Sequence, residues 1–114
     1  MDIFDVIYNC RAMRRLDTKP VPAELLVKLV DAANQAASGS NMQRARWIVV
    51  TDTGVKKKLA DLNRQGVESY IGPQTSRPDA VPHQSKEKRL RMLDAVIWQT
   101  AHMHEMPAIV MACM

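Results

Sequence analysis

Two arginines three residues apart, Arg11 and Arg14, are the first side chains in the sequence suited to binding an anion. Arg15 and Lys19 extend the same basic turn. If the turn stays near-helical, the spacing brings the Arg11 and Arg14 guanidinium groups to one side, where each offers forked donors to phosphate oxygens. Short basic runs are also common as solvated turns, so the pattern alone leaves both interpretations open.

The segment from Ser38 to Gln43 is the second candidate binding region, because it combines hydroxyls, a glycine and two amides between apolar stretches. Its backbone N–H groups can meet an anion or a carbonyl, and Asn41 and Gln43 each present a donor beside an acceptor. This combination suits the polar edge of a heterocycle. The alternative is a helix C-cap followed by a polar turn, with Gly39 in the left-handed conformation that such caps use.

The spacing of apolar residues predicts four helices that would position these two segments. The second helix has a wide apolar stripe. It ends in small residues, which leave room for another segment or a ligand to approach the helix closely. Residues 66–85 lose the helical period and contain several glycines and prolines, which predicts a long loop or insertion. The helices are expected over residues 2–9, from Pro22 to the loop at Ser38, from Asp52 or Thr53 through Leu62, and from about Lys86 to Glu105.

Two short segments, Trp47–Val50 and Ala108–Met114, are apolar without alternation, which predicts strands buried on both faces. Helices around two strands far apart in the sequence indicate an α+β or α/β fold in a single domain, residues 1–114. Two strands alone make a poor sheet. We therefore expect the sheet to be completed by more chain, by a partner chain or by both, and we do not expect the chain alone to be a stable, active monomer.

Composition narrows the class of protein. The 114 residues are 46% hydrophobic and carry a formal net charge of +4, which favours a globular domain with a negatively charged partner such as a phosphate-bearing cofactor, a nucleic acid or an acidic membrane surface. Cys10 and Cys113 are too far apart to form a disulfide framework, and the acidic N-terminus does not resemble a secretory signal. These features predict a cytoplasmic protein without a membrane anchor.

The run from Cys10 to Asp52 resembles the opening of the nitroreductase family. That family begins with an arginine-rich turn, followed by Pro-Val, an amphipathic helix that ends in small residues, and a Pro-Ser-x-x-Asn-x-Gln-Pro-Trp loop before a core strand. The stretch from Leu93 to Met114 resembles the family's mid-chain helix and the strand that follows. The matching turn residues are Arg11, Ala12 and Arg14, and the matching loop residues are Ser38, Asn41 and Gln43.

This sequence departs from the family pattern at several motif positions. Cys10 stands where many members have another arginine, and Ala12 replaces a serine, so only its backbone can serve a ligand. Ala37 replaces the loop proline, and Arg44-Ala45 replaces the Pro-Trp pair. The family's later flavin-contacting segments have no counterpart, so the chain corresponds to the N-terminal half of a family member.

The resemblance implies an α+β, nitroreductase-like fold with helices around a central mixed sheet, incomplete in this chain. It implies an obligate homodimer with FMN at the interface, in which NAD(P)H supplies electrons that pass through the flavin to a nitroaromatic, quinone or similar small-molecule acceptor. Arg11 would then hold the phosphate and Arg14 would lie near the pyrimidine end of the flavin. The expected cofactor-binding set is Arg11, Ala12, Arg14, Ser38, Ser40, Asn41 and Gln43, with the loop contributed by either subunit. No residue is assigned as catalytic or as a metal ligand.

Three other interpretations follow from the same residues. One is a different activity of the same superfamily, such as reductive dehalogenation or flavin fragmentation, because the segments that decide acceptor specificity are variable or absent. Another is a non-catalytic or truncated flavin-binding fragment. The third is a small basic nucleic-acid-binding module, which an aromatic content of 4% and the lack of a groove-reading motif disfavour.

Overall fold

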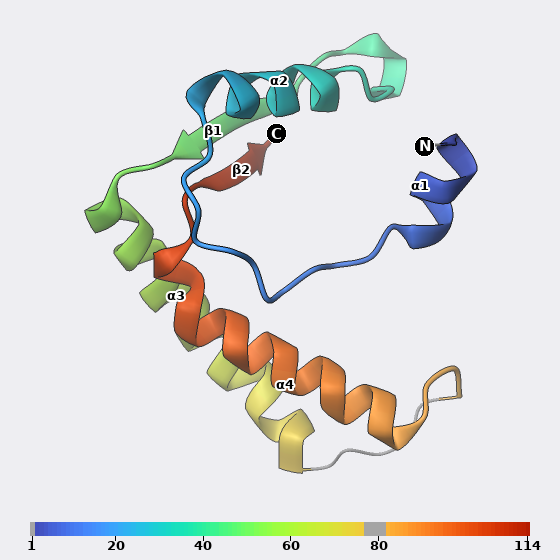
Figure 1. Cartoon of the computed structure of the whole chain (residues 1–114), viewed down its shortest axis with the longest axis vertical. Coiled ribbons are helices and arrows are strands. Elements are labelled where there is room, and N and C mark those ends of the chain that lie inside the picture. Colours follow the sequence, from blue (N-terminus) through green and yellow to red (C-terminus); the bar gives the residue numbers. More distant parts are fainter. Residues whose placement is uncertain (1, 77–81) are drawn as a thin grey trace.

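The computed structural model describes residues 2–76 and 82–114, which form four α-helices, two 3-10 helices and two strands. The strands and α2 lie at one end of the molecule, and the long helices α3 and α4 extend from it as an antiparallel pair (Figure 1). The elements in chain order are α1 (Ile3–Asn9), α2 (Ala23–Asn34), η1 (Gly39–Asn41), β1 (Arg46–Val50), α3 (Thr53–Ser76), α4 (Lys86–His102), η2 (Met103–Glu105) and β2 (Ile109–Cys113).

Helix α1 confirms the predicted first helix and begins with a capping box. The Asp2 side chain accepts from the Phe4 backbone N–H at 3.4 Å, and Asp5 accepts from the Asp2 backbone N–H at 3.2 Å. No residue of α1 is buried, and Phe4 keeps 60% of its surface exposed. The helix stands apart from the sheet, joined to α2 by an extended segment (Figure 1). Its apolar side chains are therefore not covered by the chain as described.

Helix α2 lies along β1 and buries only part of its apolar stripe (Figure 1). Leu26 is buried, and Val30 and Ala33 are half-buried. These three residues are spaced i, i+4 and i+7, so they lie along one face of the helix. The helix ends at Asn34, three to four residues before the predicted stop, and Gly39 does not adopt the expected left-handed cap. That prediction is wrong because Gln35 caps the helix with a right-handed backbone and the left-handed residues lie further along the loop.

The sheet of the described residues consists of β1 and β2, paired antiparallel from Arg46↔Cys113 to Val50↔Ile109. Both predicted strands are confirmed, whereas the mixed sheet is not seen in this part of the chain. Burial on both faces is also wrong within these residues: Ile48 keeps 51% and Val110 44% of their surfaces exposed. Helix α2 covers one side of β1 only in part, so apolar side chains of both strands remain accessible.

Helix α3 continues to Ser76, so the prediction of a loop over 66–85 is wrong for residues 66–76. Glycines and a proline weaken the local helix propensity there, but packing against α4 outweighs it. Val67 and Ile71 are half-buried, and Arg89 of α4 donates to the Gln74 side chain at 2.9 Å. Residues 77–81 lie outside the described range. A turn follows, and then Ser85 caps α4.

The buried core lies where α3, α4 and the turn before β2 meet. Ala60 and Leu93 are almost fully buried, and Met106 closes the cluster from the turn. Apolar spacing is only a partial guide to burial on α3 and α4. Val55, Leu62, Leu90, Ile97 and Ala101 lie at helical spacing and are exposed, whereas Lys56 and Thr100 are buried. The faces of α3 and α4 that contact each other are rotated about the helix axes from the faces that apolar spacing indicates. The reason is that the angle at which the helices cross decides which side chains meet.

Candidate functional site

The loop predicted to bind a ligand folds around the Ser38 hydroxyl. Ser38 Oγ accepts from the backbone N–H of Gln43 at 3.2 Å and from the Gln43 side-chain amide at 3.3 Å. The same Gln43 amide nitrogen donates to Asn41 Oδ1 at 2.7 Å. Three of the residues predicted from the sequence, Ser38, Asn41 and Gln43, therefore form one hydrogen-bonded cluster. Ser38 is half-buried, and the other two are exposed.

The backbone of this loop is left-handed at three residues that are not glycine. The φ angles are 51° at Ser40, 52° at Asn41 and 50° at Gln43. Asparagine tolerates this region because its short polar side chain bonds locally, but Ser40 and Gln43 are held there against a steric penalty. Residues in such conformations cluster at ligand-binding sites, because the surrounding structure must hold them.

Arg46 and Trp47 brace the loop, and sequence reasoning assigned neither to the site. One Arg46 guanidinium nitrogen donates to the Gln43 carbonyl at 3.1 Å and to the Ala45 carbonyl at 2.9 Å. Trp47 Nε1 donates to Asn34 Oδ1 at 2.7 Å, which links the start of β1 to the end of α2. The Arg46 contacts are local and the Trp47 contact spans 13 positions, and no spacing rule indicates either.

An open hollow of about 680 Å³ lies beside the loop. This volume falls within the range of small-molecule sites. Within the described residues, the Ser38–Asn41–Gln43 cluster leaves unused the Asn41 side-chain amide nitrogen and Gln43 Oε1, one donor and one acceptor. Such a pair fits the polar edge of a heterocycle, where donors and acceptors alternate. Ser40 is not among the lining residues, which are Asn34, Gln35, Ala36, Ala37, Ser38, Asn41, Gln43, Ala45 and Arg46.

The basic turn does not take the near-helical form on which the pairing of Arg11 with Arg14 depended. Cys10 is extended, with φ −65° and ψ 118°, and no helix follows until Ala23. Arg11 lines a separate hollow of about 530 Å³ with residues of α1, including Asp5. Arg14 is half-buried, Ala12 is exposed, and neither lines the loop hollow.

The turn and the loop therefore border different hollows with no residue in common. In the described chain, the seven predicted cofactor-binding residues form two groups rather than one site.

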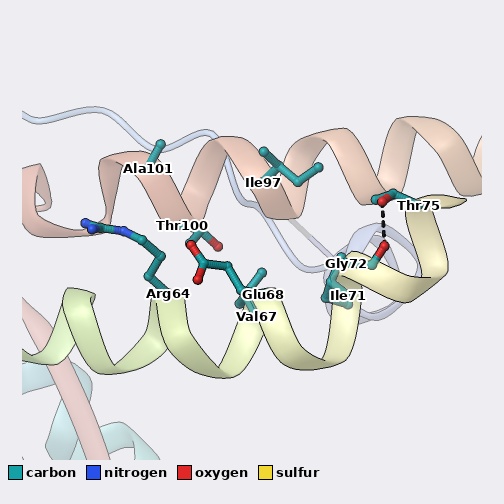
Figure 2. Close-up of a pocket in the computed structure, with 9 residues that line it drawn as sticks. All are labelled: Arg64, Val67, Glu68, Ile71, Gly72, Thr75, Ile97, Thr100 and Ala101. Atoms are coloured by element: carbon teal, nitrogen blue, oxygen red, sulfur yellow. Dashed lines mark hydrogen bonds between the residues drawn. The ribbon is translucent and has the colours of Figure 1, made fainter.

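A third hollow, of about 280 Å³, lies between α3 and α4 (Figure 2). Its walls are mainly apolar, with Ile71 and Ile97 on opposite helices, and Arg64 and Glu68 lie toward one end. None of the predicted site residues borders it. Across residues 2–76 and 82–114, no group of His, Cys, Asp and Glu could hold a metal ion, and no helix is long and apolar enough to cross a membrane.

Comparisons with known proteins place the chain in a family. The family model described as the nitroreductase family matches residues 7–112, nearly the whole sequence, so the chain belongs to the nitroreductase family. Members of this superfamily are oxidoreductases or related enzymes and typically bind flavin.

A curated relative is similar over part of the chain. Iodotyrosine deiodinase 1 of Rattus norvegicus is 26% identical over 61 residues, which make up 54% of this chain and 21% of the relative. The chain therefore matches about a fifth of that protein's length. No solved structure matches the chain significantly.

Proposed function

We propose that the protein is an FMN-dependent oxidoreductase that uses NAD(P)H and passes electrons to a nitroaromatic, quinone or similar acceptor. The observation that carries the proposal is the cluster of Ser38, Asn41 and Gln43 beside an open hollow, in a loop that resembles the flavin loop of the family to which the chain belongs. Bound FMN would supply the electron-transfer chemistry, and the protein would orient it and adjust its electronic environment.

The loop residues would act by forming hydrogen bonds to the polar edge of the flavin ring. Asn41 would donate through its free amide nitrogen, and Gln43 would accept through Oε1, while Ser38 holds the Gln43 side chain and Gln43 in turn holds that of Asn41. Arg46 keeps the Gln43 backbone in its left-handed form by binding the carbonyl. This loop is therefore organised before ligand binding, which reduces the entropy lost when a flavin docks.

The basic turn would serve the phosphate, and we propose that it does so in a homodimer. Because the turn and the loop border separate hollows in one chain, a second subunit offers a way for a turn and a loop to face the same flavin. Exposed apolar side chains on α1, β1 and β2 provide a surface for such association. Arg11 would bind the phosphate, with Arg14 and the Ala12 backbone nearby.

Flavin titration of the full chain, followed by a flavin-dependent NAD(P)H oxidation assay, tests the proposal. We expect the wild-type protein to bind FMN and to reduce a quinone or nitroaromatic when NAD(P)H is added. Asn41→Ala should weaken FMN binding about 5- to 10-fold without changing the far-UV circular dichroism, since one hydrogen bond contributes about 1 kcal/mol. Asn63→Ala, on α3 and away from the loop, is the matched control. A wild-type chain that binds no FMN would contradict the proposal.

Reductive dehalogenation is a second candidate, favoured by the similarity to a protein named as an iodotyrosine deiodinase. In such a reaction two electrons and a proton replace a carbon–iodine bond with a carbon–hydrogen bond and release iodide. The test is iodide release from iodotyrosine by the FMN-loaded protein with dithionite as reductant. Iodide release together with slow quinone reduction would favour this activity, and the opposite result would favour the first.

A further inference from the structure

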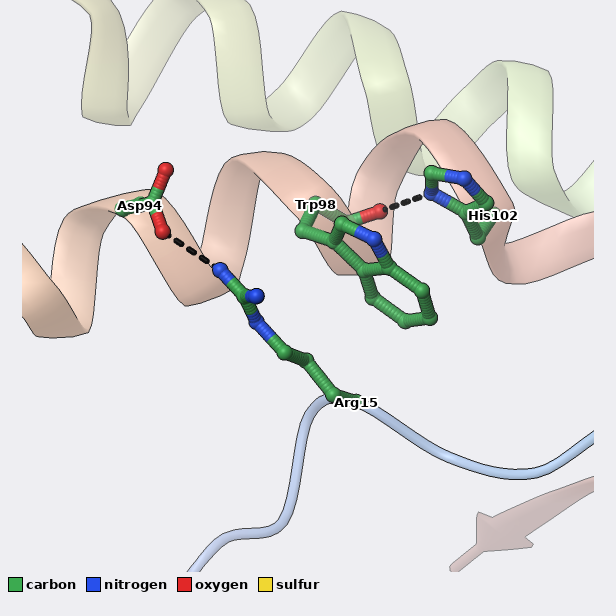
Figure 3. Close-up of polar contacts among 4 residues, drawn as sticks. All are labelled: Arg15, Asp94, Trp98 and His102. Carbon is green, nitrogen blue, oxygen red and sulfur yellow. Dashed lines mark hydrogen bonds and ion pairs between the residues drawn. The ribbon is translucent and has the colours of Figure 1, made fainter.

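Arg15 links the basic turn to α4, although it was not among the predicted cofactor-binding residues. Its guanidinium pairs with the Asp94 carboxylate at 2.5 Å, a contact that spans 79 positions of the sequence. The same guanidinium lies over the Trp98 ring, 5.9 Å from its centroid. Figure 3 shows Arg15 reaching from the extended segment to these two residues one turn apart on α4.

The surface that receives Arg15 is itself held in place. Trp98 and His102 stack with centroids 4.1 Å apart and an interplanar angle of 10°. His102 Nδ1 lies 2.8 Å from the Trp98 carbonyl oxygen (Figure 3). Because a carbonyl only accepts, that ring nitrogen carries the proton and donates. The His102 imidazole thus restrains the Trp98 indole, which lies one helical turn earlier on α4. Arg15 therefore meets an ordered aromatic face and a carboxylate.

Few polar contacts tie the extended segment to the rest of the described chain. Between the end of α1 and the start of α2, the other polar side-chain contact seen in the described chain is local: Lys19 pairs with Asp17 at 3.1 Å. Arg14, the neighbour of Arg15, has no ion-pair partner within residues 2–76 and 82–114. Among the polar side-chain contacts of the described residues, the one that joins this segment to α4 is therefore made by Arg15.

We infer that Arg15 is a positioning residue that docks the phosphate-binding turn onto α4 through Asp94 and Trp98. This inference rests on the proposed FMN function, and it assigns α4 a part in flavin affinity that the family motifs do not indicate. Fixing Arg15 limits the conformations open to Arg11 and Arg14, so less entropy is lost when they close on a phosphate. Arg15 acts through its neighbours, and its own guanidinium is engaged by Asp94.

The test compares FMN with riboflavin, which lacks the phosphate, in titrations of the full chain. We expect Arg15→Ala to raise the FMN dissociation constant about 3- to 10-fold, because it removes both the exposed ion pair and the cation–π contact. Asp94→Asn removes the ion pair alone and should raise it about 2- to 5-fold. Riboflavin affinity should change less than about 2-fold, because the loop that reads the ring system is untouched. Lys19→Ala removes a nearby charge that bonds only locally, and it should leave the ratio of the two affinities near the wild-type value.

The charge-reversed pair, Arg15→Asp with Asp94→Arg, separates positioning from direct phosphate binding. Recovery of FMN affinity in the double variant would support positioning, because the contact is restored while position 15 is acidic. A phosphate effect of Arg15→Ala that Asp94→Asn does not share would overturn the inference, since Arg15 would then bind the phosphate itself. Equal loss of FMN and riboflavin affinity would also overturn it, as a general effect on folding. If Arg15→Ala does not fold, Asp94→Asn and the reversed pair decide the matter.

Failure of this inference differs from failure of the proposed function. A wild-type chain that binds FMN, with variants that keep its FMN-to-riboflavin ratio, would remove the role of Arg15 and leave the proposed function standing. A wild-type chain that binds neither flavin would overturn the function, and the inference with it.

Discussion

Lys56 offers the clearest test of how the core supports the sheet and its loop. Its side chain is 7% exposed, and Nζ donates to the Met106 carbonyl at 2.7 Å, which joins the first turn of α3 to the turn before β2. Lys56→Met keeps the length of the aliphatic stem and removes the ammonium. A hydrogen bond from a charged donor contributes about 1.5–3 kcal/mol, and relief from burying the charge offsets part of its loss. We expect a net destabilisation of about 1.5 kcal/mol.

That loss converts into a measurable change of melting temperature. An unfolding entropy of about 2.1 cal/mol/K per residue gives roughly 0.24 kcal/mol/K for 114 residues, so the expected shift is about 6 °C. Lys56→Ala should lose about 2 kcal/mol more, since three buried methylene groups disappear as well.

Thermal unfolding followed by circular dichroism without flavin measures both changes. Lys57→Met is the matched control. The Lys57 side chain, next to Lys56 in the sequence, is exposed, so replacing it should change the melting temperature little. If Lys56→Met melts at the wild-type temperature or above it, the buried bond does not stabilise the fold and the reasoning is refuted.

Three further predictions test the turn, the start of α3 and the exposed sheet. Arg11→Ala should weaken FMN binding by about 1.5–3 kcal/mol, roughly 10- to 150-fold in Kd, as measured by flavin titration; unchanged affinity would remove Arg11 from the site. Asp52→Ala should lower the free energy of unfolding by about 1 kcal/mol in urea titration, because its side chain accepts from the Val55 backbone N–H at 2.8 Å; a midpoint equal to that of the wild type would show that the cap is not needed. Ile48→Glu, at a half-exposed apolar position on β1, should shift the protein from dimer to monomer in sedimentation; a variant that remains dimeric would place the interface elsewhere.

The sequence by itself predicted the features that depend on neighbouring residues. The cap of α3, expected at Asp52 or Thr53 and found at Asp52, the places of the two strands and of most of the helices, and the residues of the loop follow from short-range hydrogen bonding and apolar spacing. The family motifs identified Ser38, Asn41 and Gln43, which the structure brings together, because the three lie within one short loop. Their role in binding FMN stays a prediction.

The tertiary structure decided what depends on residues far apart in the chain. The antiparallel pairing of Arg46 with Cys113, the helical course of residues 66–76 and the burial of Lys56 each arise from contacts between segments whose path the local sequence does not encode. The contact of Arg15 with Asp94 is of the same kind. Local propensities differ by about 1 kcal/mol or less per residue, so packing between distant elements outweighs them wherever the two disagree.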